Sequence, residues 1–471
     1  MPTRDTRRPN ILFFFTDDQR FDTIHALGNK QIITPTMDAL VAEGTAFTNA
    51  YIMGGTSGAV CMPSRAMLMT GRTLFHITQQ GQSISPEYTT MGECFQQAGY
   101  TTFGTGKWHN GKESYSRTFS DGAEIFFGGM ADHWNVPAYH FDPTGKYETT
   151  RPIIQDYFYS NKVTERHCDH VTAGKHSSEL LGDAAIDFLQ RRNADDPFFL
   201  YLAFLAPHDP RSMPKEYRDL YDPDTIELPK NFMGAHPFDK GHLKVRDEVL
   251  EEWPRTPEAI RRHIAEYYAM ITHADAQMGR VIAALKETGE YENTIIVFAG
   301  DNGLALGQHG LMGKQSLYEH SIHVPLVMCG PGIPRDERRE AFTYLIDIFP
   351  TLCELTETPI PATVEGQSLV PVFDNAENQL RETMIFAYTE LHRGARDARY
   401  KLIEYAVDGR RTTQLFDLQQ DPWELTNLAD DPAYADHLQR LRQSTCAWRD
   451  ELGDTQEQGT IFWNTYSSIS D

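Results

Sequence analysis

The stretch that decides the fold is PNILFFFTDD, at residues 9–18. Its unbroken apolar run is typical of a strand buried on both faces in the middle of a parallel sheet. Two further runs of this kind occur at residues 197–206 and 294–299. Helical patterns alternate with them, and the longest spans residues 258–286 with apolar side chains at helical spacing. This alternation predicts a doubly wound α/β core.

Polar side chains follow two of these predicted strands. Asp17 and Asp18 end the first stretch, and Asp301 and Asn302 follow the run at residues 294–299. Ligands of open α/β sheets bind at the carboxyl ends of strands. Carboxylate and amide oxygens without a nearby cysteine pair suit Ca²⁺ or Mg²⁺ better than zinc. Acids at a strand end more often cap the next helix, so the metal interpretation needs further support.

A second motif, CMPSRAMLMTGR, lies at residues 61–72. Pro63 suits the first turn of a helix, so Cys61 is predicted at a helix N-terminus, where free amides and the helix dipole favour anionic groups. The preceding residues 54–58, GGTSG, indicate a flexible loop. A lone cysteine is usually a small buried hydrophobe, but here Arg65 and a Leu-x-Thr-Gly-Arg segment follow it.

Basic or imidazole side chains occur in several loops that glycine or proline interrupts. They are Arg65, Lys107, His109, His208 and Lys314. Each one alone has an ordinary explanation, because a loop lysine is usually solvated and a loop histidine often bonds a carbonyl. The formal net charge of −23 argues against nucleic acid and anionic membranes as partners. An anionic substrate therefore needs a local cluster of cations, which these loops would supply at one edge of the sheet.

Together these motifs resemble the type I sulfatases of the alkaline phosphatase superfamily. The Cys-x-Pro-Ser-Arg signature with its Leu-x-Thr-Gly-Arg extension is highly specific, and the other motifs agree in order. Matching sequence continues to QLFDLQQDPWELTNL at residues 414–428, so the resemblance covers most of the chain. It implies an alkaline-phosphatase-like large sheet flanked by helices, with a smaller C-terminal α+β subdomain.

The resemblance also implies a cofactor and a modification. A bound Ca²⁺ would be held by Asp17, Asp18, Cys61, Asp301 and Asn302. In the family a separate formylglycine-generating maturation enzyme oxidises the signature cysteine, here Cys61, to formylglycine. This aldehyde works as its hydrate.

Carried over to this sequence, the family gives each basic side chain a role. Arg65 would orient the hydrate, and Lys107 and Lys314 would clamp the sulfate oxygens. His109 would stand beside the nucleophile, and His208 would face the oxygen of the leaving group as a general acid.

The implied activity is hydrolysis of a sulfate ester, and we expect a sulfated carbohydrate as the substrate. The main alternative is a phosphonate monoester or phosphodiester hydrolase, but such relatives tend to carry Asp-Gln and Asp-His at the two metal pairs. A sulfatase of aryl or choline sulfate is another alternative. A catalytically silent glycan-binding member should have lost the nucleophile or a metal ligand, and this chain has lost neither.

Candidate substrate-binding residues lie in two places. His133 belongs to an irregular insertion at residues 114–175 that we expect near the pocket. His392, Arg393 and Arg396 lie in a polar stretch at residues 390–396, where family members often place residues that read the substrate. A solvated surface loop is an equal explanation for that stretch.

A length of 471 residues predicts one large domain and one smaller one, placed here at residues 1–365 and 366–471. Alternating segments after residue 366 predict a small antiparallel sheet, followed by a helix at 431–451 and a tail. The six scattered cysteines predict neither disulfides nor a zinc site. No membrane span or signal-peptide core is visible, so we expect a cytoplasmic protein as written, and a periplasmic or secreted one if a leader was trimmed.

Overall fold

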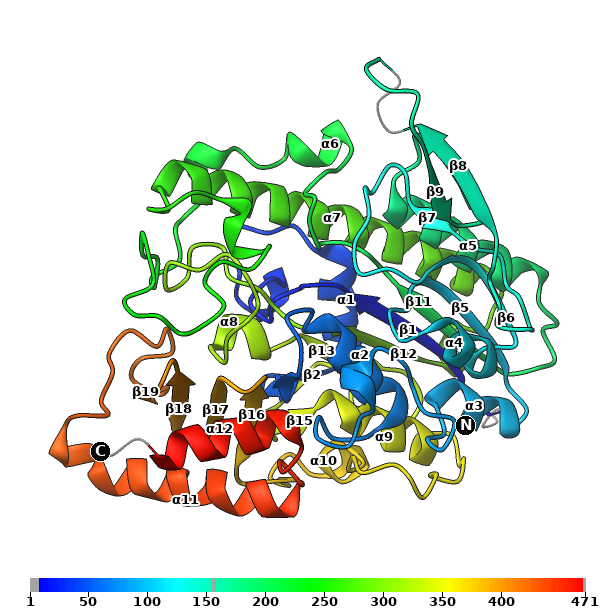
Figure 1. The fold of residues 1–471 in the computed structure, drawn as a ribbon. Coiled ribbons are helices and arrows are strands. Elements are labelled where there is room, and N and C mark those ends of the chain that lie inside the picture. Colours follow the sequence, from blue (N-terminus) through cyan, green and yellow to red (C-terminus); the bar gives the residue numbers. More distant parts are fainter. Residues whose placement is uncertain (1–7, 155–157, 469–471) are drawn as a thin grey trace.

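The computed structural model describes residues 8–154 and 158–468, and its centre is an eight-stranded sheet (Figure 1). In order across the sheet the strands are β14 (Glu337–Arg339), β2 (Gly44–Phe47), β13 (Leu326–Cys329), β12 (Thr294–Gly300), β1 (Asn10–Thr16), β11 (Phe198–Ala203), β5 (Thr101–Lys107) and β6 (Asp121–Phe126). The predicted central strand β1 pairs in parallel with both β11 and β12. Strands β5 and β6 extend the parallel part, whereas β13 runs antiparallel and makes the sheet mixed.

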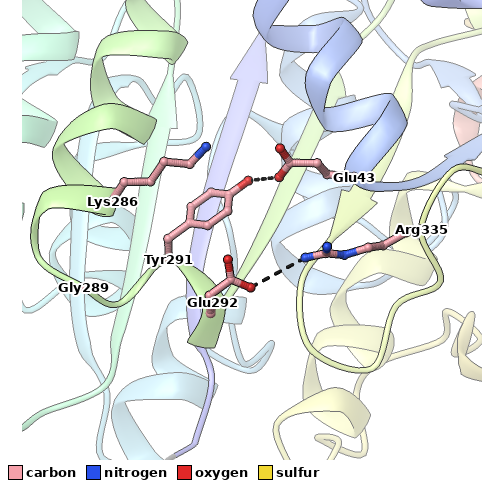
Figure 2. A pocket seen from close by; sticks show the side chains of 6 residues that line it. All are labelled: Glu43, Lys286, Gly289, Tyr291, Glu292 and Arg335. Carbon is pink, nitrogen blue, oxygen red and sulfur yellow. Dashed lines mark hydrogen bonds and ion pairs between the residues drawn. The ribbon is translucent and has the colours of Figure 1, made fainter. Parts of the chain in front are cut away.

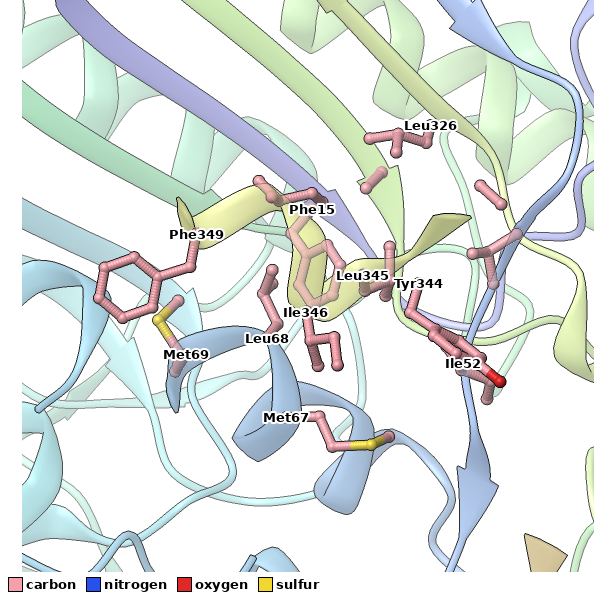
Figure 3. Close-up of a cluster of buried hydrophobic side chains, with 14 of the residues drawn as sticks. Phe15, Ile52, Met67, Leu68, Met69, Leu326, Tyr344, Leu345, Ile346 and Phe349 are labelled. Atoms are coloured by element: carbon pink, nitrogen blue, oxygen red, sulfur yellow. The ribbon is translucent and has the colours of Figure 1, made fainter. Parts of the chain in front are cut away.

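Helices cover both faces of the sheet. Alternate residues of β1 point to opposite sides and are apolar on both, so each face needs a covering layer. Leu12 and Phe14 pack towards α1 (Pro35–Glu43), α5 (Ser177–Arg191) and α7 (Pro257–Glu287). On the other face lie α2 (Cys61–Thr70), α3 (Met91–Gln97) and α9 (Ile348–Leu355). Figure 3 shows Phe15 of β1 above Leu68 of α2, within this second core. The apolar face of α2 thereby fixes the helix whose first residue is Cys61.

The C-terminal part forms a five-stranded sheet in the order β19 (Arg410–Asp417), β18 (Tyr400–Val407), β17 (His392–Arg396), β16 (Met384–Tyr388) and β4 (Gly54–Gly55). The expectation of a flexible loop at residues 54–58 was therefore wrong at its start, because β4 pairs with β16. Gly54 has a φ of 104°, and a Cβ atom there would collide with the backbone of Ala387. Gly54 thus marks a close backbone approach.

Other segments also differ from their predictions. The insertion at residues 114–175 is less irregular than expected, because it contributes the edge strand β6 to the main sheet. The surface-loop explanation for residues 390–396 was wrong, because all of β17 is buried. The C-terminal tail contains α12 (Glu457–Ser468), and Gln458 Nε2 in it donates to the carbonyl of Thr56 at 2.9 Å. The tail thus lies against the loop that precedes Cys61.

The remaining elements are short, apart from one long C-terminal helix. The helices are α4 (Lys112–Thr118), α6 (Lys215–Arg218), α8 (Glu319–Ile322), α10 (Val370–Asp374) and α11 (Ala435–Glu451). The strand pairs are β3 (Ala50–Tyr51) with β15 (Thr343–Tyr344), β7 (Pro137–Ala138) with β10 (His170–Val171), and β8 (Thr150–Ile154) with β9 (Val163–His167). Within the described residues, no helix is both long and apolar enough to cross a bilayer. All six cysteines are free.

Candidate active site

The polar residues predicted at strand ends meet at the carboxyl edge of the main sheet. Asp17 follows β1, Asp301 follows β12, and Lys107 is the last residue of β5. Backbone hydrogen bonds continue the pairing past the strands, from Asp17 N to the carbonyl of Ala206 (3.1 Å) and from Asp301 N to that of Thr16 (3.0 Å). The two carboxylates are therefore placed by the rigid centre of the sheet.

Cys61 begins α2 and points into this cluster. Its Sγ lies 3.4 Å from Lys107 Nζ, 3.5 Å from His109 Nδ1 and 3.9 Å from Lys314 Nζ. The side chain is 2% exposed, and burial raises the pKa of the Cys61 thiol. Arg65 follows one helical turn later and so lies on the same face of α2. Sequence motifs at three separate places thus meet around one sulfur atom.

The acidic side chains can hold a hard cation. Ligand atoms of Asp17, Cys61 and Asp301 all lie within 4.8 Å of one another, and so do those of Asp17, Asp18 and His208. Asp17 Oδ1 and Asn302 Oδ1 are buried and have no hydrogen-bond partner among the described residues. An unsatisfied buried polar atom costs about 1–3 kcal/mol. A cation with oxygen ligands would satisfy both atoms, so the residues present fit the predicted Ca²⁺ site.

Buried cations balance these carboxylates. Arg65 donates from Nε to Asp301 Oδ2 and its Nη2 also lies near this oxygen, both at 2.9 Å, while its Nη1 donates to the carbonyl of Lys107 (2.8 Å). Lys107 pairs with Asp17, and Lys314 Nζ lies 2.6 Å from Asp18 Oδ1. Burial opposes ionisation of Asp17, but the surrounding positive charges, that of Lys107 foremost, together outweigh it and hold the pKa of Asp17 well below its usual range. Burial, with the negative charge of Asp17, raises the pKa of Asp301 to about 7.

Two histidines stand beside the cluster. His109 has a φ of 70°, and burial together with the charge of Lys107 lowers its pKa to about 2, so the ring is neutral. His208 follows β11, and its Nδ1 donates to the carbonyl of Asp209 at 2.8 Å. Its Nε2 faces Asp18 Oδ2 at 3.6 Å. His208 thus presents Nε2 at the rim of the same group of acids.

The residues predicted to contact substrate are each engaged by protein groups. His133 Nε2 donates to the carbonyl of His208 at 2.9 Å, and His392 Nε2 lies 2.6 Å from the carbonyl of Lys240. Arg393 makes a bidentate ion pair with Asp454, at 2.6 and 2.9 Å. Arg396 bonds the hydroxyl of Tyr51 and lies 3.4 Å from Glu319. Their side chains are buried, and a substrate role for them stays a prediction.

The sequence did not predict three polar residues at the site: Gln315, Asp247 and Arg246. Gln315 Nε2 donates to the carbonyl of Gly58 (2.8 Å) and to Asp247 Oδ2 (2.6 Å), which ties the loop before Cys61 to the loop after Lys314. Arg246 is 44% exposed and pairs with Asp209, the neighbour of His208. Residues 211–257 show no periodicity, so their sequence offers no signal beyond an arginine next to an acid.

A separate surface pocket of about 370 Å³ lies at the opposite edge of the sheet, at the amino ends of β2 and β12 (Figure 2). Its polar groups pair with one another, since Tyr291 donates to Glu43 and Arg335 lies 3.6 Å from Glu292. The Lys286 ammonium group lies over the Tyr291 ring, 4.3 Å from its centroid. Nothing in this pocket resembles the donor set at the carboxyl edge.

Comparison with known proteins identifies relatives along most of the chain. A sulfatase family model matches residues 9–358, and a model described as N-sulphoglucosamine sulphohydrolase, C-terminal, matches residues 307–451. An arylsulfatase of Clostridium perfringens is 30% identical over 467 residues, which cover 93% of each chain. An N-acetylglucosamine-6-O-sulfatase of Bacteroides thetaiotaomicron is 25% identical and covers 96% of this chain and 87% of that protein.

A solved structure extends the likeness to three dimensions. It shows a protein in complex with its substrate D-glucosamine-2-N,6-O-disulfate, and it matches with a TM-score of 0.77 at 23% identity, over 96% of this chain and 99% of that one. This likeness supports the fold. The chain belongs to the sulfatase family, with its alkaline-phosphatase-like fold, and is a sulfuric ester hydrolase.

Proposed function

We propose that the chain hydrolyses sulfate esters of a carbohydrate, with Cys61 converted to formylglycine and a Ca²⁺ ion held beside it. The observation that carries the proposal is the position of Cys61 at the start of α2, with two lysines and a histidine within 4 Å of Sγ. The carbohydrate part rests on the names of relatives, which include an N-acetylglucosamine-6-O-sulfatase. A maturation enzyme of the host would carry out the oxidation.

The modification and the metal supply the reactive groups. As formylglycine hydrate, Cys61 would supply two hydroxyls, one to attack sulfur and one whose deprotonation would release sulfate. Asp17, Asp18, Asp301 and Asn302 with the modified Cys61 would hold Ca²⁺, which would supply Lewis acidity to the sulfate and the nucleophile. The unpartnered Asp17 Oδ1 and Asn302 Oδ1 support this ligand set.

Side chains around Cys61 would bind the sulfate and accept protons. Lys107 pairs with Asp17 and Lys314 with Asp18, and both ammonium groups lie within 4 Å of Cys61 Sγ. They would therefore bind the equatorial sulfate oxygens and stabilise the charge that develops there. Arg65 donates to Asp301, which has an oxygen within 4.8 Å of Cys61 Sγ and would accept the proton of the attacking hydroxyl. His109 Nδ1 lies close enough to Cys61 to accept the proton of the second hydroxyl.

His208 completes the cycle as the general acid. Its Nδ1 donates to a backbone carbonyl, so the proton that it can transfer sits on Nε2. Protonation of the leaving sugar oxygen is the step that an alkoxide leaving group requires.

Substrate class is tested with a panel of sulfated mono- and oligosaccharides, each with one defined sulfate position, beside an aryl sulfate and a phenylphosphonate monoester. We expect sulfate release from at least one sugar, and little turnover of the phosphonate because the second metal pair is Asp301-Asn302. Good turnover of aryl sulfate with none of any sulfated sugar would overturn the carbohydrate assignment. A preference for the phosphonate would favour the phosphonate hydrolase alternative.

The metal makes a separate prediction. Elemental analysis of the purified protein should find a single calcium ion and no zinc, because the ligands are oxygen atoms apart from position 61. Asp17→Asn should lose calcium and should lose the rise in melting temperature that added Ca²⁺ gives the unaltered protein. Asp121→Asn, on the outer strand β6, is the matched control and should retain both. A zinc pair in the unaltered protein would contradict the ligand assignment.

A further inference from the structure

A buried histidine holds the backbone of the proposed general acid. His133 is 1% exposed, and its Nε2 lies 2.9 Å from the carbonyl oxygen of His208. A carbonyl oxygen only accepts, so Nε2 must carry a proton. Burial lowers the pKa of His133 to about 4, which leaves the ring neutral at neutral pH. Its Nδ1 then accepts from the hydroxyl of Ser177, at 2.7 Å.

A second buried histidine, His176, bonds a backbone carbonyl four residues after that of His208. His176 stacks on His133 with ring centroids 5.1 Å apart and an interplanar angle of 6°. Its Nε2 donates to the carbonyl of Ser212 at 2.9 Å, and its Nδ1 accepts from the backbone of Ser178 as the N-cap of α5. Burial lowers the pKa of His176 to about 2, so this ring is neutral as well. The two rings therefore bind both ends of the segment at residues 208–212.

Further packing supports the pair from behind. His273 of α7 lies 4.5 Å from His176, and Tyr217 lies 4.5 Å from His273, measured between ring centroids. Of these stacked rings, that of His273 belongs to α7, a helix of 31 residues. His176 and His273 thus sit on the core helices α5 and α7, and His133, in a turn of the insertion, is tied to α5 through Ser177.

The direction of the His208 ring depends on this backbone. The hydrogen bond of the ring itself runs from Nδ1 to the carbonyl of the next residue, Asp209. That bond turns with the segment, so it does not by itself fix the ring relative to the sheet. The bonds from His133 and His176 fix the backbone of the segment relative to the rest of the protein, because these rings belong to other parts of the chain.

We propose that His133 and His176 form a positioning pair for His208, which fixes the backbone of residues 208–212 and thereby aims His208 Nε2 at the leaving-group oxygen. The proposal rests on the proposed function in that His208 is taken as the general acid. In this proposal His133 acts through the backbone, because its side chain is buried and both of its ring nitrogens bond protein groups.

The test compares sulfate esters whose leaving groups differ in pKa, from a sulfated sugar to nitrophenyl sulfate. His133→Ala should lower kcat/KM on the sugar on the order of a hundredfold and on the aryl ester less than about tenfold, because a misplaced acid matters most for a poor leaving group. His133→Gln should restore most of the loss, since its amide can donate to the same carbonyl. Ser177→Ala, a milder change, should move the leaving-group dependence in the same direction by less.

His236→Gln is the matched control. His236 is an imidazole that bonds a backbone carbonyl, that of Phe238 at 2.8 Å, on a different loop. Its loss should leave the leaving-group dependence unchanged. Thermal melting of each variant measures any loss of stability, and Ser177→Ala keeps the test valid if His133→Ala does not fold.

Double variants separate this proposal from the role of His208. If His133 acts through His208, His133→Ala should add little further loss in a His208→Ala background. Fully additive losses, or equal losses of His133→Ala on sugar and aryl esters, would overturn the positioning pair. If His208→Ala itself leaves the leaving-group dependence unchanged, the general-acid assignment fails, and non-additivity of the two variants still reports whether the histidines are coupled.

Discussion

Cys61→Ala is expected to lower kcat on any sulfate ester by about 10⁴-fold or more, even when the chain is produced together with a formylglycine-generating enzyme. Alanine has no sulfur to oxidise, so neither hydroxyl of the hydrate can form. The surroundings should stay intact, because Cys61 lies on the first turn of α2 and the helix is fixed by Met67, Leu68 and Met69 in the core (Figure 3).

Mass spectrometry of the peptide that contains Cys61 measures the conversion to the aldehyde alongside activity. The unaltered chain made without the maturation enzyme should fold normally and stay nearly inactive, because a thiol lacks the second hydroxyl. Cys446→Ala is the control, since Cys446 is exposed and belongs to α11. It should keep full activity and full conversion of Cys61. Undiminished turnover by Cys61→Ala would refute the assignment of the nucleophile.

The centre of the fold could be predicted because its strands are buried on both faces. Each of β1, β11 and β12 is an apolar run with no other plausible place than the middle of a parallel sheet. Strand β17 could not be predicted, because its sequence, HRGAR, is polar. Its arginines are buried only because Asp454 and Glu319 arrive from distant parts of the chain to pair with them.

The candidate site divides in the same way. Asp17, Asp301 and Lys107 follow from topology, because parallel neighbours end at one edge of a sheet and each residue stands at a strand end. The contacts of His133 do not follow, because they depend on how an insertion folds against a loop about 75 residues away in the chain. His133 is visible in the sequence, whereas the carbonyl that it bonds is not.

His208→Ala is expected to lower kcat/KM on a sulfated sugar by about 10²–10⁴-fold, the usual contribution of a general acid, and to reduce turnover of nitrophenyl sulfate far less. A sugar alkoxide is a poor leaving group and needs a proton as the S–O bond breaks, whereas a nitrophenolate leaves without one. The geometry favours this role because Nδ1 is committed to the carbonyl of Asp209 and Nε2 faces the acidic cluster.

Lys314→Ala provides the matched comparison for His208→Ala. Lys314 Nζ lies 3.9 Å from Cys61 Sγ, where it would bind sulfate oxygens that every substrate shares. Its loss should therefore slow sugar and aryl esters alike, by on the order of a hundredfold. A His208 that only bound sulfate would behave as Lys314 does, with equal losses on both esters. The ratio of the two losses, measured for both variants, therefore distinguishes an acid that serves the leaving group from a cation that serves the sulfate.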